Sequence, residues 1–138
     1  MTDYSSLKRV PRSWLVQSKH DLEAAIANAE DGRHALACFL AQQSAEKAVV
    51  AFLYNHGAEH VWGHALADLC ADATAFDQSF EFVKSIAGLL DKHYVGARYP
   101  QTLIGGAPCE THEALDSERA LEIARDVLAG VEERLGLS

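Results

Sequence analysis

Apolar residues recur at alternating steps of three and four along most of this chain, a pattern typical of amphipathic α-helices. Proline stands only at positions 11, 100 and 108, so long stretches contain no helix breaker. The pattern predicts helices over about 12–29, 33–55, 64–73, 77–94 and 115–135. Mostly short links join them, which favours an all-α fold: an up-and-down bundle of four long antiparallel helices plus one short helix.

Glycines mark two of the predicted helix ends. Asp31-Gly32 follows the first helix, and Gly57 stands where a left-handed residue would close the second. Residues 100–113 contain two of the three prolines and an adjacent glycine pair, so we expect a loop there. We therefore divide the chain into a flexible N-terminal segment, 1–11, and one helical bundle domain, 12–138.

Composition narrows the class of protein. The 138 residues are 49% hydrophobic and 23% charged, an ordinary balance for one globular domain. The formal charge of −8 disfavours avid binding to nucleic acid, so we do not expect an RNA partner unless the chain is a nuclease. No apolar run reaches the roughly 20 residues of a membrane span, and the N-terminus lacks the apolar core of a signal peptide. We expect a cytoplasmic protein with reduced cysteines and no membrane association.

A polar cluster interrupts the apolar face of the second predicted helix. The stripe through Leu36, Leu40 and Val50 also passes through Gln43 and Lys47, and the neighbouring stripe passes through Glu46. Buried polar groups cost free energy unless they are paired. Either a neighbouring helix satisfies this cluster while Lys47 extends to solvent, or the cluster faces a ligand or another chain.

The segment FLAQQSAEKAVVAFLYNHG (39–57) resembles the second helix of the HEPN domain, a nucleotide-binding helical module of higher eukaryotes and prokaryotes. Two further motifs agree in order: Gly63-His64-Ala65-Leu66, and Tyr94 followed by Ala97-Arg98-Tyr99-Pro100. The resemblance extends from about residue 14 to 135. It implies a bundle of four long helices with a short extra one, usually a homodimer, often encoded beside a small nucleotidyltransferase that it binds.

The resemblance also implies a ligand-binding site that the three motifs share. An arginine beside aromatic rings suits a phosphate or a nucleobase, although it can equally cap a helix or pair with a carboxylate. We expect Glu46 to lie near Arg98, and His64 either to cap the third helix or to join the same pocket. The expected ligand-binding residues are Gln43, Glu46, Lys47, His64, Tyr94, Arg98 and Tyr99.

Some members of the family are ribonuclease toxins in which a histidine follows an arginine by four to six residues. Thr102, Leu103 and Ile104 stand at those distances from Arg98. We therefore expect no catalytic residue, and a non-catalytic module that dimerises and partners a small nucleotidyltransferase, binds a nucleotide or phosphate group near Arg98, or both. The alternative is a metal-independent ribonuclease that takes its proton-transfer group from elsewhere, such as His64, His93 or His112. The sequence leaves open whether a dimer would use the second or the fourth helix.

Metal binding is not expected from spacing alone. His56, His60 and His64 follow a helical spacing, but intervening glycines interrupt the helix. Cys109 and His112 have a plausible ligand spacing, yet no second pair matches them. We predict no metal site, and no cofactor apart from a nucleotide ligand.

Overall fold

The computed structural model describes residues 2–61, 65–93, 107 and 111–137. Within these ranges every regular element is a helix, which confirms the predicted all-α class. The elements are α1 (Arg9–Glu30), α2 (His34–Asn55), α3 (Leu66–Thr74), α4 (Phe80–Ala87), the 3-10 turn η1 (Gly88–Leu90) and α7 (Ala114–Arg134).

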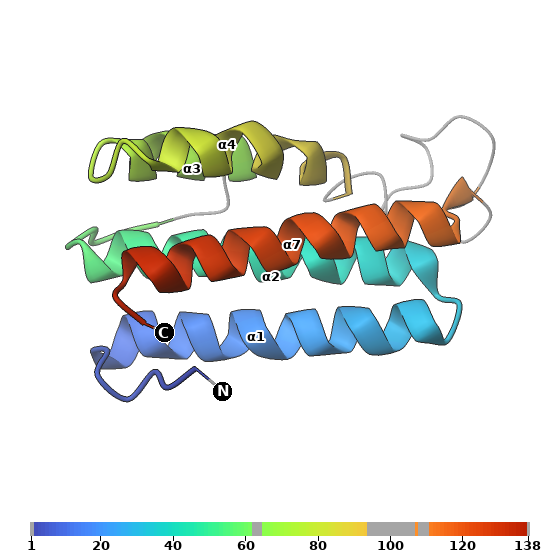
Figure 1. Cartoon of the computed structure of the whole chain (residues 1–138), viewed down its shortest axis with the longest axis horizontal. Coiled ribbons are helices and arrows are strands. Elements are labelled where there is room, and N and C mark those ends of the chain that lie inside the picture. The colour runs from blue at the N-terminus through green and yellow to red at the C-terminus, as the bar shows by residue number, and fades with distance from the viewer. Residues whose placement is uncertain (1, 62–64, 94–106, 108–110, 138) are drawn as a thin grey trace.

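Four of the helices, α1, α2, α4 and α7, alternate in direction, as an up-and-down bundle requires. In Figure 1, α1 runs from left to right, α2 returns, α4 runs from left to right again, and α7 returns. α2 is the central helix because it contacts α1, α3 and α7. The shorter pair of α3 and α4 packs together and forms a layer on the side away from α1.

The helix ends follow local chemistry. Gly32 and Gly57 have φ angles of 79° and 95°, in the left-handed region that glycine adopts without steric cost. Both predicted glycine ends are therefore confirmed. α7 begins with a capping box, in which the Glu113 backbone N–H donates to Asp116 Oδ2 at 2.8 Å and the Glu113 side chain accepts from the Asp116 backbone.

The first half of α2 buries mainly small side chains, whereas its second half buries larger ones such as Val49, Phe52 and Leu53. Leu36 is 43% exposed, whereas four alanines are fully buried: Ala37, Ala41, Ala45 and Ala48. Small residues let α1 approach closely, so that Ser18 Oγ donates to the Ser44 carbonyl at 2.6 Å and Ser44 Oγ donates to the Ser18 carbonyl at 2.8 Å. The predicted stripe is therefore wrong at Leu36, where alanines fill the core instead, and is confirmed at Val50, which is buried.

By length and composition α2 is also apolar enough to cross a membrane, with a mean hydropathy of 1.2 over its most apolar window. However, 67% of that window is buried against the rest of the bundle. Such burial is typical of the central helix of a bundle, so α2 is weak evidence for a membrane span.

Two boundaries differ from the prediction. α1 begins at Arg9, three residues before the expected start, and the Tyr4 hydroxyl donates to Glu132 Oε2 at 2.8 Å. The flexibility assigned to residues 1–11 stays a prediction. α4 ends at Ala87 and continues as η1, after which the Asp91 carboxylate accepts from the backbone N–H groups of Leu66 and Ala67 at 2.6 and 3.1 Å. Asp91 thus caps the first turn of α3.

Candidate functional site

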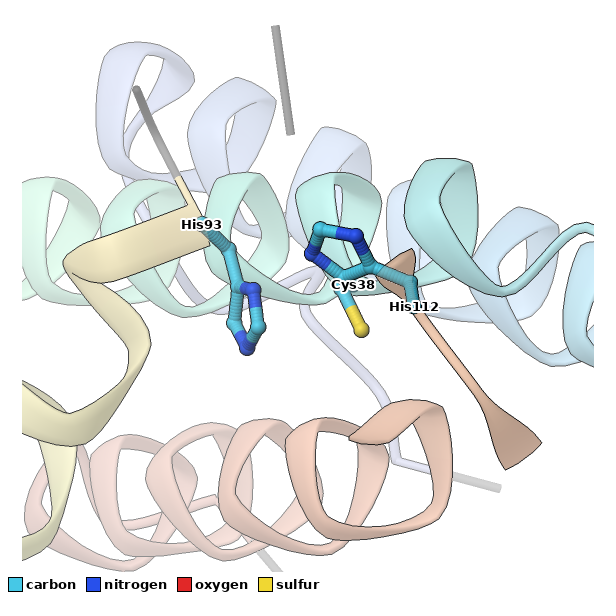
Figure 2. Close-up of side chains that lie close together, drawn as sticks. All are labelled: Cys38, His93 and His112. Carbon is cyan, nitrogen blue, oxygen red and sulfur yellow. The ribbon is translucent and has the colours of Figure 1, made fainter. Parts of the chain in front are cut away.

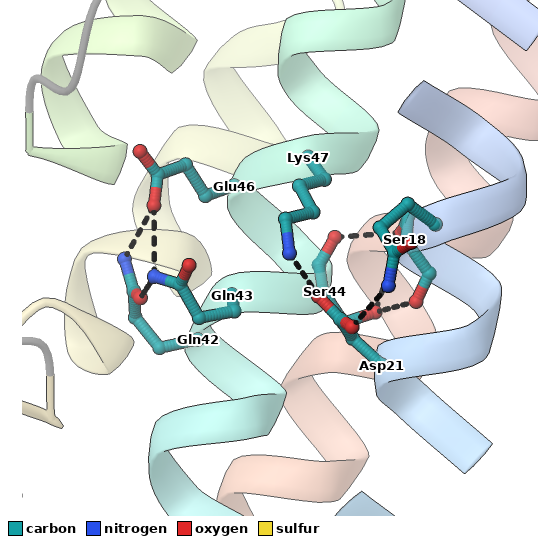
Figure 3. A network of polar contacts seen from close by, with 8 residues as sticks. Ser18, Asp21, Gln42, Gln43, Ser44, Glu46 and Lys47 are labelled. Carbon is teal, nitrogen blue, oxygen red and sulfur yellow. Dashed lines mark hydrogen bonds and ion pairs between the residues drawn. The ribbon is translucent and has the colours of Figure 1, made fainter. Parts of the chain in front are cut away.

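The polar cluster on α2 divides between two directions (Figure 3). Gln43 Nε2 donates to Glu46 Oε2 at 3.2 Å and to Gln42 Oε1 at 2.7 Å. Lys47 instead forms an ion pair with Asp21 of α1. Consecutive residues of an α-helix point about 100° apart, so Glu46 and Lys47 reach different neighbours.

The Lys47–Asp21 pair ties α1 to α2. The two side chains are only 23% and 9% exposed, and Gln17 Nε2 also donates to Asp21 Oδ1 at 2.8 Å. The expectation that Lys47 extends to solvent is therefore wrong, because Asp21 holds its ammonium group within the helix interface. A neighbouring helix satisfies this half of the cluster.

Glu46 forms the other half, together with two amides. Burial raises the pKa of the Glu46 carboxyl; hydrogen bonds from Gln42 and Gln43 and the charge of Lys47 oppose this effect, and the nearby Asp91 adds to it. The net direction of the pKa is upward. Glu46 therefore accepts a proton more readily than an exposed glutamate, and its carboxyl can serve as either a hydrogen-bond acceptor or, once protonated, a donor.

A pocket of about 510 Å³ opens beside Glu46. This volume is within the usual range for small-molecule sites. The rings of Trp14 and Tyr54 stack with centroids 6.2 Å apart and planes 20° apart, and the Tyr54 hydroxyl accepts from the Val61 backbone N–H at 3.3 Å. The pocket thus combines aromatic faces with amide, carboxyl and imidazole groups. Its lining residues are Trp14, Gln43, Glu46, Lys47, Tyr54, His60 and Val61.

This lining includes residues that were not among the ligand-binding residues predicted from the sequence: Trp14, Tyr54, His60 and Val61. Tyr54 could have been found, because the stripe through Gln43 and Lys47 reaches it after a further seven residues. Trp14 comes from α1, and the pairing of two helices in space leaves no local pattern in the sequence. His60 lies after the end of α2, where helical periodicity no longer applies.

Four predicted site residues lie outside the described residues: His64, Tyr94, Arg98 and Tyr99. The expected contact between Glu46 and Arg98 therefore stays a prediction, because Arg98 is one of these residues. Among the described residues, Asp91 is a charged neighbour of Glu46, and in addition to burial its negative charge raises the pKa of the Glu46 carboxyl. Asp91, which follows η1, is therefore close enough to Glu46 for its charge to act on that carboxyl.

A second cluster contains side chains of the kinds that bind metal ions. Cys38, His93 and His112 come from three separate parts of the chain, and their potential ligand atoms all lie within 4.8 Å of one another (Figure 2). Burial raises the pKa of the Cys38 thiol to about 12, with a further contribution from Asp116. Burial also lowers the pKa of His93 to about 4. Without a bound metal ion, these two groups are thus a neutral thiol and a neutral imidazole at physiological pH.

Solved structures similar to this chain share its architecture. TT1696 from Thermus thermophilus is 37% identical, with a TM-score of 0.83 over 89% of this chain and 96% of that one. ST0689, an archaeal HEPN homologue, is 33% identical, with a TM-score of 0.75 over 92% and 98% of the two chains. An HEPN domain protein of Thermotoga maritima is 29% identical, with a TM-score of 0.72 over 90% and 98%.

Curated proteins give no significant match to this chain. The HEPN domain family, in contrast, matches residues 11–134, from the first turn of α1 to the last residue of α7. The match therefore spans the whole bundle, including the helix that carries Gln43 and Glu46. Together with the helical architecture, this match shows that the chain belongs to the HEPN domain family.

Proposed function

We propose that this chain is a non-catalytic HEPN module whose pocket beside Gln43 and Glu46 binds a nucleotide. The observation that carries the proposal is the composition of the pocket, in which hydrogen-bonding side chains of α2 lie beside the rings of Trp14 and Tyr54. A nucleobase needs both features, an aromatic face for stacking and polar groups for its edge. The pocket volume of about 510 Å³ accommodates a nucleoside.

The charges around the pocket favour one orientation of the ligand. Glu46 would repel a phosphate, and the charge of Lys47 is already balanced by Asp21. The base therefore faces Gln43 and Glu46, where a carboxylate accepts from N–H groups on the base edge. The phosphates point outward, toward the exposed His60 of the lining. Arg98 lies outside the described residues and stays our predicted phosphate ligand.

The non-catalytic part of the proposal rests on the sequence. A ribonuclease of this family type uses a histidine four to six residues after an arginine, and no histidine follows Arg98 at that distance. An RNA cleavage assay with purified protein tests this part. Cleavage that is lost in the Arg98→Ala variant would contradict the proposal and favour the ribonuclease alternative.

Isothermal titration calorimetry with nucleoside mono-, di- and triphosphates tests nucleotide binding. We expect saturable binding of at least one nucleotide by the wild-type protein, and weaker binding by Gln43→Ala. Asn28→Ala is a suitable control because Asn28 is also a helical amide, on α1, but its side chain donates to its own helix at the Ala24 carbonyl. Absence of binding by the wild type, or equal losses in both variants, would contradict the proposal.

We also propose that the chain forms a homodimer through the outer face of α4 and η1. Phe82 and Leu89 are the two most exposed large apolar side chains in the described structure, at 69% and 60%. They stand seven residues apart, about two helical turns, and so lie on one face. A second copy of the chain would remove both from water at the same time.

The nucleotidyltransferase partner is a proposal from the family resemblance. Affinity purification of the full chain from its host, followed by mass spectrometry, tests it. Recovery of a small nucleotidyltransferase at near-equal molar amount supports the partnership, and its absence from replicate preparations contradicts it.

A further inference from the structure

The cluster of Cys38, His93 and His112 joins three parts of the fold. Cys38 belongs to the first turns of α2, His93 follows η1, and His112 stands just before the capping residue of α7. Figure 2 shows the Cys38 sulfur and the two imidazole rings in the space between α2 and α7. Cys38 is fully buried and His93 is 5% exposed, whereas His112 is half-buried. We infer that these three side chains form a binding site for one Zn²⁺ ion.

The distances allow a zinc site after small side-chain movements. Zinc binds nitrogen at about 2.0–2.1 Å and sulfur at about 2.3 Å, so the ligand atoms of a tetrahedral site lie about 3.4–3.6 Å apart. The three potential ligand atoms are within 4.8 Å of one another. A contraction of each separation by about 1.4 Å at most closes the site. Because His112 is at the surface end of the cluster, rotation of its side chain can supply much of this movement.

The donor set selects the kind of metal. One thiolate and two imidazoles suit a borderline-soft ion such as Zn²⁺, whereas Mg²⁺ and Ca²⁺ prefer oxygen ligands. The carboxylate of Asp116 lies near enough to both Cys38 and His93 to affect them electrostatically, and its negative charge favours a cation there. Lys92 has the opposite effect on both groups.

Binding would exchange a proton for the metal. Cys38 is a thiol in the metal-free protein, so the Zn–S bond replaces the S–H bond and the proton passes to solvent. Three protein ligands leave a fourth position for water. A pocket of about 200 Å³, lined by His93 together with Lys92, Asp116 and Arg119, gives solvent access to this end of the bundle.

The metal site is independent of the nucleotide proposal. Its residues share no member with the lining of the pocket beside Glu46. The ring contact between His93 and His112, with centroids 5.6 Å apart and planes 52° apart, brings the two imidazoles together at the Cys38 sulfur. Three metal-ligating side chains thus converge from distant parts of the sequence on one partly buried point, as the ligands of a metal site do.

The test is zinc titration of the full-length protein after removal of metal with a chelator. We expect one Zn²⁺ per chain, with an affinity that falls more than about 100-fold in both Cys38→Ser and His112→Gln. Cys70→Ser is the matched control for the first variant, because Cys70 is equally buried and its thiol pKa is likewise raised to about 12. His20→Gln, at an exposed position of α1, is the control for the second.

Cobalt gives a second, spectroscopic measurement. Co²⁺ in the site should show thiolate-to-cobalt charge-transfer absorption that is lost in Cys38→Ser and kept in Cys70→Ser. Cys38→Ser changes a buried residue and could prevent folding. His112→Gln changes a half-buried residue instead, so it tests metal binding in a protein whose fold circular dichroism can confirm. The proposal is overturned if the wild type binds no zinc, if His112→Gln binds it as tightly as the wild type, or if Cys70→Ser loses binding to the same extent.

Discussion

Lys47 of α2 forms an ion pair with Asp21 of α1, whereas the adjacent Glu46 accepts hydrogen bonds from Gln42 and Gln43 of its own helix. The polar residues that form one cluster in the sequence therefore make two separate sets of contacts in the fold. The Lys47 half joins α1 to α2 and supports the bundle. The Glu46 half has its hydrogen bonds within α2 and, with Lys47 beside it, lines the pocket. This division separates variants that should change stability from variants that should change binding.

Asp21→Asn should lower the free energy of unfolding by about 2 kcal/mol, because it leaves the Lys47 ammonium without its counter-charge in a mostly buried interface. Urea denaturation measures this change. Asp31→Asn is the matched control: Asp31 pairs with Arg33, but both side chains are about two-thirds exposed, so its loss should cost less than about 0.5 kcal/mol. Equal effects of the two substitutions would contradict the structural role of the Lys47–Asp21 pair.

Glu46→Gln should change how stability depends on pH. The pKa of Glu46 is raised above its ordinary value of 4.5 in the folded state, so the folded protein binds this proton more tightly than the unfolded chain does. The contribution of Glu46 to stability is therefore present below pH 4.5 and is lost as the pH rises through the folded pKa. Glutamine does not titrate, so the variant does not lose stability in this way. The free energy of unfolding of the variant, relative to that of the wild type, should therefore increase as the pH rises from 4.5 through the folded pKa of Glu46. Denaturant unfolding at a series of pH values measures the difference, and a difference independent of pH would contradict the shift.

Trp14→Ala should weaken nucleotide binding by about 5- to 150-fold, since stacking of a base on an aromatic ring is worth about 1–3 kcal/mol. Calorimetric titration with the nucleotide that the wild type binds gives this ratio. Phe76→Ala serves as the comparison, because Phe76 is an exposed aromatic residue whose ring contacts His56 and which does not line the pocket. A similar loss in both variants would show that the effect is not specific to the pocket.

Phe82→Glu should convert the dimer to a monomer, because it places a charge at the centre of the proposed contact. Light scattering coupled to size-exclusion chromatography measures the mass. Leu36→Glu, on the exposed face of α2, should leave the dimer intact and so distinguishes the two helices that the sequence left open. A monomeric wild type, or dissociation by Leu36→Glu alone, would contradict this interface.

Helix positions were predictable because they depend on local signals. Apolar periodicity located α1, α2, α3 and α7 to within three residues at each end, and Gly32 and Gly57 end α1 and α2 as expected. The predicted fourth helix, in contrast, extends seven residues beyond the end of α4. The division of α4 and η1 was not predicted, and neither was the contact of Asp91 with the start of α3, which joins distant segments of the chain.

The candidate sites were less predictable because they depend on packing. Gln43 and Glu46 stood out by their polarity, but Trp14 and Asp21 come from another helix whose register against α2 is set by small residues such as Ser18 and Ser44. Cys38, His93 and His112 have no common spacing, so no ligand motif could identify them. Only the packing of α2, η1 and α7 brings them together.

The central claim, a nucleotide in the pocket beside Glu46, is tested most directly by an NMR titration that follows side-chain N–H signals. The account predicts saturable shifts of the Trp14 indole and Gln43 amide signals. The Asn28 amide, about 21 Å along α1 from Trp14, should not shift. Signals of Trp14 and Gln43 that stay unchanged at saturating nucleotide, or shifts as large at Asn28, would contradict the claim.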